Sequence, residues 1–230
     1  MTTRKTFIGD IVANDFRAAE LFKEANIDFC CGGKMSLEEA CSEKGIDPQG
    51  FLDNLSTLSD TPDNTGRNYK DWKLDFLCDY IVNTHHQYVQ KALPDLYGYT
   101  QKIASVHGDG HPELIEVANL FEGLKEELTQ HLGKEEEVLF PAIKELLASN
   151  SQESKSTIIS EIDRMDKEHE AAGGAMDKIN EITNNYSLPA DACNTYQVCF
   201  KMLSQFEDDL HIHVHLENNI LYKKALEMSV

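Results

Sequence analysis

Two stretches of this sequence share one pattern: residues 131–140 read HLGKEEEVLF and residues 213–222 read HVHLENNILY. Each begins with a histidine, has a glutamate four residues later, and ends with two aliphatic residues and an aromatic residue. Residues four apart lie on one face of an α-helix, so each stretch places an imidazole and a carboxylate one turn apart. The pattern predicts two helices that each present a His and a Glu to a buried interior.

Histidines upstream of these stretches extend the similarity. His86 precedes His131 by 45 residues, and His169 precedes His213 by 44 residues. Two copies of one helical hairpin would produce this spacing, with one histidine on every helix and one glutamate on the second helix of each copy.

The rest of the sequence predicts an all-α protein, because long stretches are rich in Ala, Leu, Glu and Lys and strand-like alternation is absent. Four long helices are expected, over residues 72–106, 112–147, 156–182 and 189–227. Short connections favour antiparallel neighbours, so the expected architecture is an antiparallel up-down four-helix bundle. Pro94 and Pro141 are expected to kink the first two helices.

The chain is expected to divide into three parts. Residues 1–60 predict a small helical N-terminal domain, residues 61–71 a polar linker rich in helix breakers, and residues 72–230 the bundle. Within the first part, helix starts are expected at Asn14 or Asp15, at a Ser36–Glu39 capping box, and at Asp47 followed by Pro48.

Composition excludes several classes of partner. The formal net charge of −19 repels phosphate backbones and anionic lipids, so neither nucleic acid nor a membrane surface is an expected partner. The first residues show no signal peptide, and the six cysteines include an adjacent pair but no CxxC motif. We therefore expect a cytoplasmic protein with reduced thiols, and the sequence leaves a homodimer open.

Four imidazoles and two carboxylates at one level of a bundle are the ligands that a dinuclear metal site requires. Each carboxylate can bridge two ions and each ion keeps two histidines, which leaves a position open for O₂, peroxide or NO. This donor set suits iron or manganese better than thiolate-preferring metals. A solvated pair on a surface helix is the plain alternative for one stretch alone, but two matched stretches favour the metal site.

The periodicity does not choose between His85 and His86, because both fit an apolar stripe. Adjacent residues are about 100° apart on a helix, so only one of them is expected to face the interior. The repeat spacing favours His86.

Other polar residues near the pattern have weaker roles. His211 and His215 lie off the face of the second His–Glu pair, so we expect them to be exposed or to act only indirectly. His107 is roughly 30 Å from His86 along a continuous helix, too far to share a site. Glu127 and Glu168 are candidates for hydrogen-bonding or proton-relay groups around the centre, and solvated carboxylates are the equal alternative.

Residues 28–34, DFCCGGK, resemble the signature of the small domain of the iron-sulfur cluster repair proteins, the RIC family. Residues 131–141, the Glu168-His169 pair and residues 213–221 resemble the hemerythrin-type di-iron bundle of the same family. Together these segments extend the resemblance over nearly the whole chain. One departure is Tyr222-Lys223, where Phe-Pro is expected.

The resemblance implies two non-haem iron ions with oxo and carboxylate bridges. The implied iron ligands, with Glu135 and Glu217 as the bridging carboxylates, are His86, His131, Glu135, His169, His213 and Glu217. It also implies repair of iron-sulfur clusters damaged by oxidative or nitrosative stress, with the damaged iron-sulfur proteins as clients. Iron donation, NO reduction and, as in ordinary hemerythrins, O₂ binding remain alternative activities.

Cys30 and Cys31 in the DFCCGGK turn admit two interpretations. They are either a reactive or metal-handling thiol pair, or small apolar residues packed against the bundle. Their chemistry alone does not separate the two.

Overall fold

The computed structural model describes residues 2–59 and 67–229. Within these ranges every regular element is a helix, and one isolated β-bridge joins Phe7 and Ser36, so the all-α prediction is confirmed. Residues 61–66 of the predicted linker lie outside the described residues. Within the described ranges, none of the helices combines the length and apolar character that crossing a bilayer requires.

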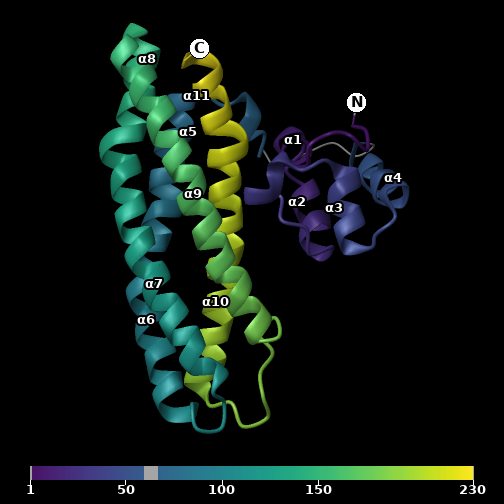
Figure 1. Cartoon of the computed structure of the whole chain (residues 1–230), viewed down its shortest axis with the longest axis vertical. Helices are drawn as coiled ribbons and strands as arrows, with labels where there is room; N and C mark the ends of the chain where they lie inside the picture. The colour runs from purple at the N-terminus through teal and green to yellow at the C-terminus, as the bar shows by residue number, and fades with distance from the viewer. Residues whose placement is uncertain (1, 60–66, 230) are drawn as a thin grey trace. The chain divides into compact units, whose positions relative to one another are not determined.

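The chain forms two units, one of Met1–Leu77 with His211–Val230 and one of Cys78–Leu210. The four long helices expected from the sequence are present (Figure 1), but their bounds differ from the predicted ones, and all except the third consist of consecutive segments. Their segments are α5 (Leu74–Ile81), η3 (Val82–His86) and α6 (Gln87–His107); α7 (Glu113–Lys134), η4 (Glu135–Leu139) and α8 (Phe140–Ser149); α9 (Gln152–Ile182); and α10 (Asn194–His215), η5 (Leu216–Leu221) and α11 (Tyr222–Ser229).

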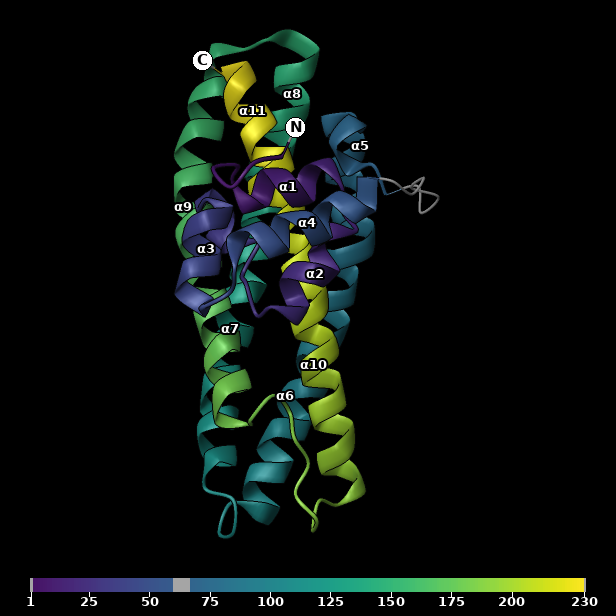
Figure 2. The same ribbon diagram turned by 90° about the vertical axis from the view of Figure 1, so that its right-hand side faces the viewer.

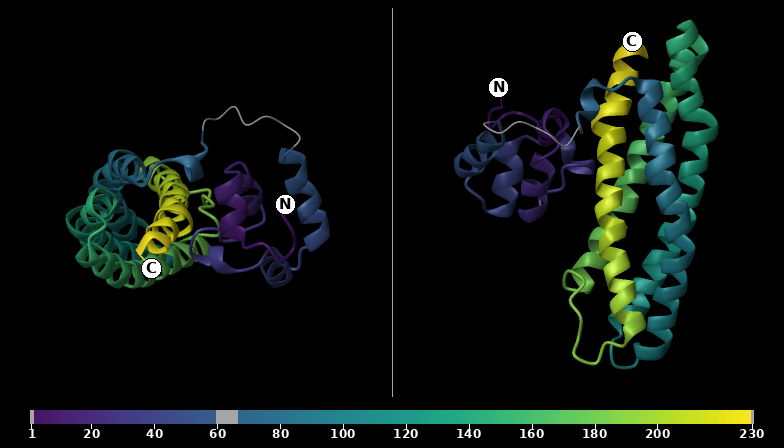
Figure 3. Two further views of the ribbon diagram at one scale, coloured as in Figure 1. Left: turned by 90° about the horizontal axis from the view of Figure 1, so that it is seen from above. Right: turned by 180° about the vertical axis from the view of Figure 1, so that it is seen from behind.

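In the unit of residues 78–210, long helices pack side by side around a common apolar interior, seen end-on in Figure 3. Helix α7 contacts both α6 and α9. The Phe206 ring on α10 closes the bundle, with ring-centroid distances of 5.8 Å to Phe121 on α7 and 6.3 Å to Tyr88 just after η3. Helices α6 and α7 are joined by a short turn, which makes them antiparallel neighbours.

Segments η3, η4 and η5 have π-helical geometry, which the sequence analysis did not anticipate. A π segment holds one residue more per turn than an α-helix and is frequent at functional sites. One of them, η4, ends directly before α8, whose second residue is Pro141. A proline lacks the N–H of the α-helical ladder, so this position suits a local change of helix type.

The N-terminal residues form short helices around a hydrophobic core of their own (Figure 2). Phe22 and Phe51 meet in this core with their ring centroids 5.1 Å apart. The elements are α1 (Ile8–Asn14), α2 (Ala18–Glu24), the 3₁₀ turn η1 (Cys31–Lys34), α3 (Leu37–Lys44), α4 (Pro48–Ser59) and the 3₁₀ turn η2 (Tyr69–Asp71).

Two of the three predicted helix starts are confirmed, and one helix was missed. The Ser36–Glu39 capping box is formed in both directions, and the Asp47 carboxylate accepts the N–H groups at the start of α4. The helix expected from Asn14 or Asp15 begins only at Ala18. Helix α1 was not expected, because its sequence IGDIVAN contains glycine and β-branched residues with low helix propensity.

Helix α1 and the turn η1 lie against η5 within their unit. The contact is closest at Gly9 and Gly33, where a Cβ atom would overlap the side-chain amide of Asn219. That amide also donates hydrogen bonds of 3.1 Å to the carbonyl oxygens of Phe29 and Cys30. The two glycines are therefore required by a close approach and not by backbone conformation.

Replacing Gly9 by alanine should lower the free energy of unfolding by about 1–3 kcal/mol, because the new methyl group meets Asn219 and the Gly33 carbonyl in a packed interface. Gly98→Ala on α6 is the matched control. Its Cβ would have open space, so it should stabilise the protein by about 0.5–1 kcal/mol. Urea unfolding of both variants tests the pair, and equal effects would contradict the packing at Gly9.

Candidate metal centre

Three helices of the unit of residues 78–210 bring four fully or almost fully buried side chains together. They are His86 on η3, His131 on α7, Glu135 on η4 and His169 on α9. Oxygen Oε2 of Glu135, which is 0% exposed, lies 3.3 Å from Nε2 of His86 and 3.4 Å from Nε2 of His131. Nε2 of His169 lies 2.9 Å from Nε2 of His131. One carboxylate thus lies between two imidazoles, and a third imidazole meets one of them.

These separations fit ligands of metal ions. Two neighbouring ligands of one ion, at bonds of about 2.1 Å and right angles, lie about 3.0 Å apart. The distance between the His131 and His169 Nε2 atoms has this value within about 0.1 Å, and the distances to Glu135 exceed it by a few tenths of an ångström. The donor set of imidazole and carboxylate suits iron, manganese or zinc.

Two carboxylates at the edge of this cluster of ligand candidates form hydrogen bonds with the Nδ1 atoms of the imidazoles. His86 Nδ1 lies 2.8 Å from Oε1 of Glu136, and His131 Nδ1 lies 2.8 Å from Oε2 of Glu168. A carboxylate can only accept, so each Nδ1 donates its proton and each Nε2 presents a lone pair to the interior. This tautomer is the one that a metal ligand needs.

The pKa of Glu168 reflects this position. Partial burial raises it, but hydrogen bonds from Lys134 and His131 outweigh burial and hold the pKa of Glu168 below its ordinary value. The carboxylate therefore remains ionised and keeps accepting the His131 proton at neutral pH.

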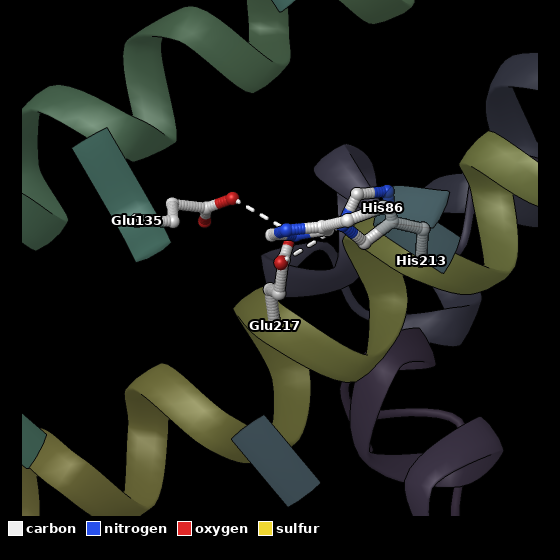
Figure 4. Close-up of side chains that lie close together, drawn as sticks. All are labelled: His86, Glu135, His213 and Glu217. Carbon is white, nitrogen blue, oxygen red and sulfur yellow. Dashed lines mark hydrogen bonds and ion pairs between the residues drawn. The ribbon is translucent and has the colours of Figure 1, made fainter. Parts of the chain in front are cut away.

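The other unit contains the second His–Glu pair, on the helix that starts as α10. His213 Nε2 lies 2.9 Å from Oε1 of Glu217, and both side chains are buried. In Figure 4 the Glu217 carboxylate points toward His213, and the Glu135 carboxylate points toward the His86 ring. Each unit therefore contains buried His and Glu side chains, the residue types that bind transition-metal ions.

A charge balance supports a cation. Two carboxylates, Glu135 and Glu217, are 0% exposed, and burying an ionised carboxylate costs several kcal/mol unless a positive partner compensates. Among the residues that the structure describes, no Lys or Arg is buried. A metal cation bound among these side chains would compensate both carboxylates together with the imidazoles that lie within 3.4 Å of them.

The histidines outside the predicted ligand set have other partners. His85 is buried like His86, contrary to the expectation that only one of them faces inward, because η3 has neighbours on two sides. His85 Nδ1 lies 2.9 Å from Oδ1 of Asp209, on α10. His107 lies at the end of α6, and its Nε2 atom is 3.1 Å from Sγ of Cys193. It is therefore not part of the cluster of four buried ligand candidates.

His215 is buried, so the expectation of an exposed position was wrong for it. Its ring packs against Phe29 at 5.6 Å, and its Nδ1 atom lies 3.1 Å from the Asn219 amide. Burial lowers the pKa of His215 to about 3, so the ring is neutral near pH 7. His211 is half-buried and lies 6.3 Å from the Phe29 ring.

The two glutamates expected around the centre differ. Glu168 binds His131, whereas Glu127 is exposed on α7 and stays a prediction. Glu136 was missed, although it stands in the run of three glutamates at 135–137. The π geometry of η4 was the missing information, since the sequence alone does not show which of three consecutive glutamates turn inward.

Comparison with known proteins adds a family context. Residues 79–225 match the model of the hemerythrin HHE cation-binding domain, and residues 4–59 match a domain of unknown function, DUF542. The iron-sulfur cluster repair protein ScdA of Staphylococcus epidermidis is 31% identical over 226 residues, which cover 98% of this chain and 100% of that protein.

Two enterobacterial relatives align over the same extent. The iron-sulfur cluster repair protein YtfE of Edwardsiella ictaluri is 35% identical over 231 residues, and that of Yersinia pseudotuberculosis is 34% identical over 229 residues. Each alignment covers 98% of this chain and 99% of the relative.

Glu136→Ala should weaken metal binding about 10–100-fold, because His86 loses the carboxylate that fixes its tautomer and orientation. Glu137→Ala is the matched control, since Glu137 is the next residue and is exposed. Metal retained by each variant during dialysis against a graded chelator series, measured by mass spectrometry, tests the difference. Equal retention in both variants would contradict the role of Glu136.

Proposed function

Because this chain belongs to the family of iron-sulfur cluster repair proteins that carry a hemerythrin-type domain, we propose that it repairs iron-sulfur clusters damaged by oxidative or nitrosative stress. It would do so as a cytoplasmic di-iron protein whose clients are damaged iron-sulfur proteins. The observation that carries the proposal is the buried Glu135 carboxylate between His86 and His131 in a chain that aligns with repair proteins over almost its whole length.

The proposed ligands extend this group with the second His–Glu pair. His213 lies near the end of α10 and Glu217 lies in η5, and in the sequence repeat they correspond to His131 and Glu135. The proposed set holds two iron ions and consists of His86, His131, Glu135, His169, His213 and Glu217. Glu135 and Glu217 would bridge the ions, which the spacing of the repeat and the burial of both carboxylates support.

The protein's own residues have separate tasks in this proposal. When bound, a carboxylate-bridged di-iron centre supplies iron and redox equivalents that a damaged cluster lacks. Glu136 and Glu168 keep His86 and His131 in the tautomer that binds. Leu128 and Leu139, about one helical turn before His131 and one turn after Glu135, are buried, and such apolar neighbours would limit the access of water to the centre. As the activity of the centre we propose iron donation, with NO reduction or O₂ binding as the alternatives.

The purified protein should contain about two iron ions per chain and show the visible absorption of an oxo-bridged iron pair. Metal analysis and a visible spectrum of the same sample test this. A single zinc ion, or no metal after expression in iron-replete medium, would refute the di-iron proposal.

Glu135→Ala and Glu217→Ala should each lower the iron content and the repair rate together, because each removes one bridging carboxylate. Repair is measured as recovered activity of a purified iron-sulfur dehydratase inactivated with NO. Glu137→Ala, at an exposed position on η4, is the control and should behave as wild type. Full repair by a variant that has lost its iron would disprove the link between the centre and the activity.

A further inference from the structure

The turn of residues 28–34 gathers two thiols and a carboxylate. Asp28 accepts backbone N–H groups from Cys30 at 2.8 Å, Cys31 at 3.1 Å and Gly32 at 2.8 Å. Its Oδ1 atom also accepts the Cys30 thiol at 2.9 Å. The two Sγ atoms are 4.0 Å apart, and one ligand atom from each of the three side chains lies within 4.8 Å of the others.

Hydrogen bonds and ring packing within its unit fix the position of this turn. The Asn219 amide donates to the carbonyls of Phe29 and Cys30, and the Phe29 ring packs on His215. The hydrogen bonds to Asp28 fix its carboxylate beside the thiols. A site built on this turn therefore needs little ordering when a ligand binds.

We propose that Asp28, Cys30 and Cys31 form a second metal site, which takes one thiophilic divalent cation such as Fe²⁺ or Zn²⁺. Two thiolates on one tetrahedral ion, at bonds of about 2.3 Å, lie about 3.8 Å apart, close to the separation of the Sγ atoms in the turn. The site does not depend on the repair function or on the di-iron centre.

The exposure of the turn to solvent and the negative charge of the protein favour a cation-binding role for these thiols over a role as small packed residues. Cys30 is buried, but Cys31 is half-buried and Asp28 is exposed, so an ion can arrive from solvent. The protein carries a net charge of −19, which raises the local concentration of cations. A fully buried thiol such as Cys41 in the same unit lacks this access from solvent.

Binding has a defined proton balance. Each thiol that binds loses one proton to solvent, no electron is transferred, and the two new bonds are metal–sulfur bonds. Loss of the Cys30 proton also removes the thiol hydrogen bond to Asp28 Oδ1, while that oxygen keeps the backbone hydrogen bonds that hold the carboxylate beside the two sulfur atoms. The hydrogen bond with Cys31, burial and the nearby Asp28 charge all raise the pKa of Cys30, so its thiol is protonated at neutral pH without metal.

The test is a titration of the purified protein, with its own metal centre loaded, with Co²⁺ as the probe. We expect a near-ultraviolet thiolate-to-cobalt charge-transfer band that saturates at about one Co²⁺ per chain. Absence of this band would overturn the proposal.

Three variants assign the band. Cys31→Ser and Cys30→Ser should abolish it, and circular dichroism checks that each remains folded. Cys31 is the safer of the two substitutions, since it is only half-buried. Cys193→Ser is the matched control, because Cys193 is an exposed thiol beside His107 and the obvious competitor for cobalt. A band that survives in Cys31→Ser and disappears in Cys193→Ser would refute the site.

Discussion

A carboxylate buried among imidazoles is the constraint on which the rest of this structure depends. Glu135 has no contact with solvent, and its Oε2 atom lies near His86 and His131. Neutral imidazoles cannot compensate a full negative charge in a low-dielectric interior. A cation bound here would therefore stabilise the arrangement of the helices that carry these residues. The carboxylates of Glu136 and Glu168 accept the Nδ1 protons of His86 and His131, so the Nε2 atoms of these histidines face the cation.

Helical periodicity and the repeat predicted the fold well, because long apolar stripes specify which face of a helix is buried. They did not predict three features, each for a physical reason. Helix α1 depends on tertiary packing and has weak local propensity. His85 is buried because a helix in a bundle packs against two neighbouring helices. An apolar stripe in the sequence predicts only one buried face. Glu136 turns inward because η4 is π-helical, and the spacing of hydrophobic residues in the sequence does not predict a π segment.

The repeat is also less exact in structure than in sequence. His86 ends a π segment, whereas its counterpart His169 lies in α9, which is a single α-helix from Gln152 to Ile182. The second copy has gained another role as well. His213 and Glu217 form one pair four residues apart, and His215 and Asn219 form another. The two pairs are about 200° apart around the helix, so one face carries the proposed ligand pair and the opposite face contacts the N-terminal turn.

The π segments carry a consequence for how such a centre can change over evolutionary time. Each corresponds to one residue inserted into a helix whose two ends keep their packing. Glu135 stands at such an insertion, so its direction is set by a local change of register while the flanking α7 and α8 remain ordinary helices. Deletion of one residue there would return the segment to α-helical geometry, so α7 and α8 would keep the faces that they bury and only the side chains of the segment, Glu135 among them, would change direction. The direction of this carboxylate can therefore change without loss of the helices that flank it.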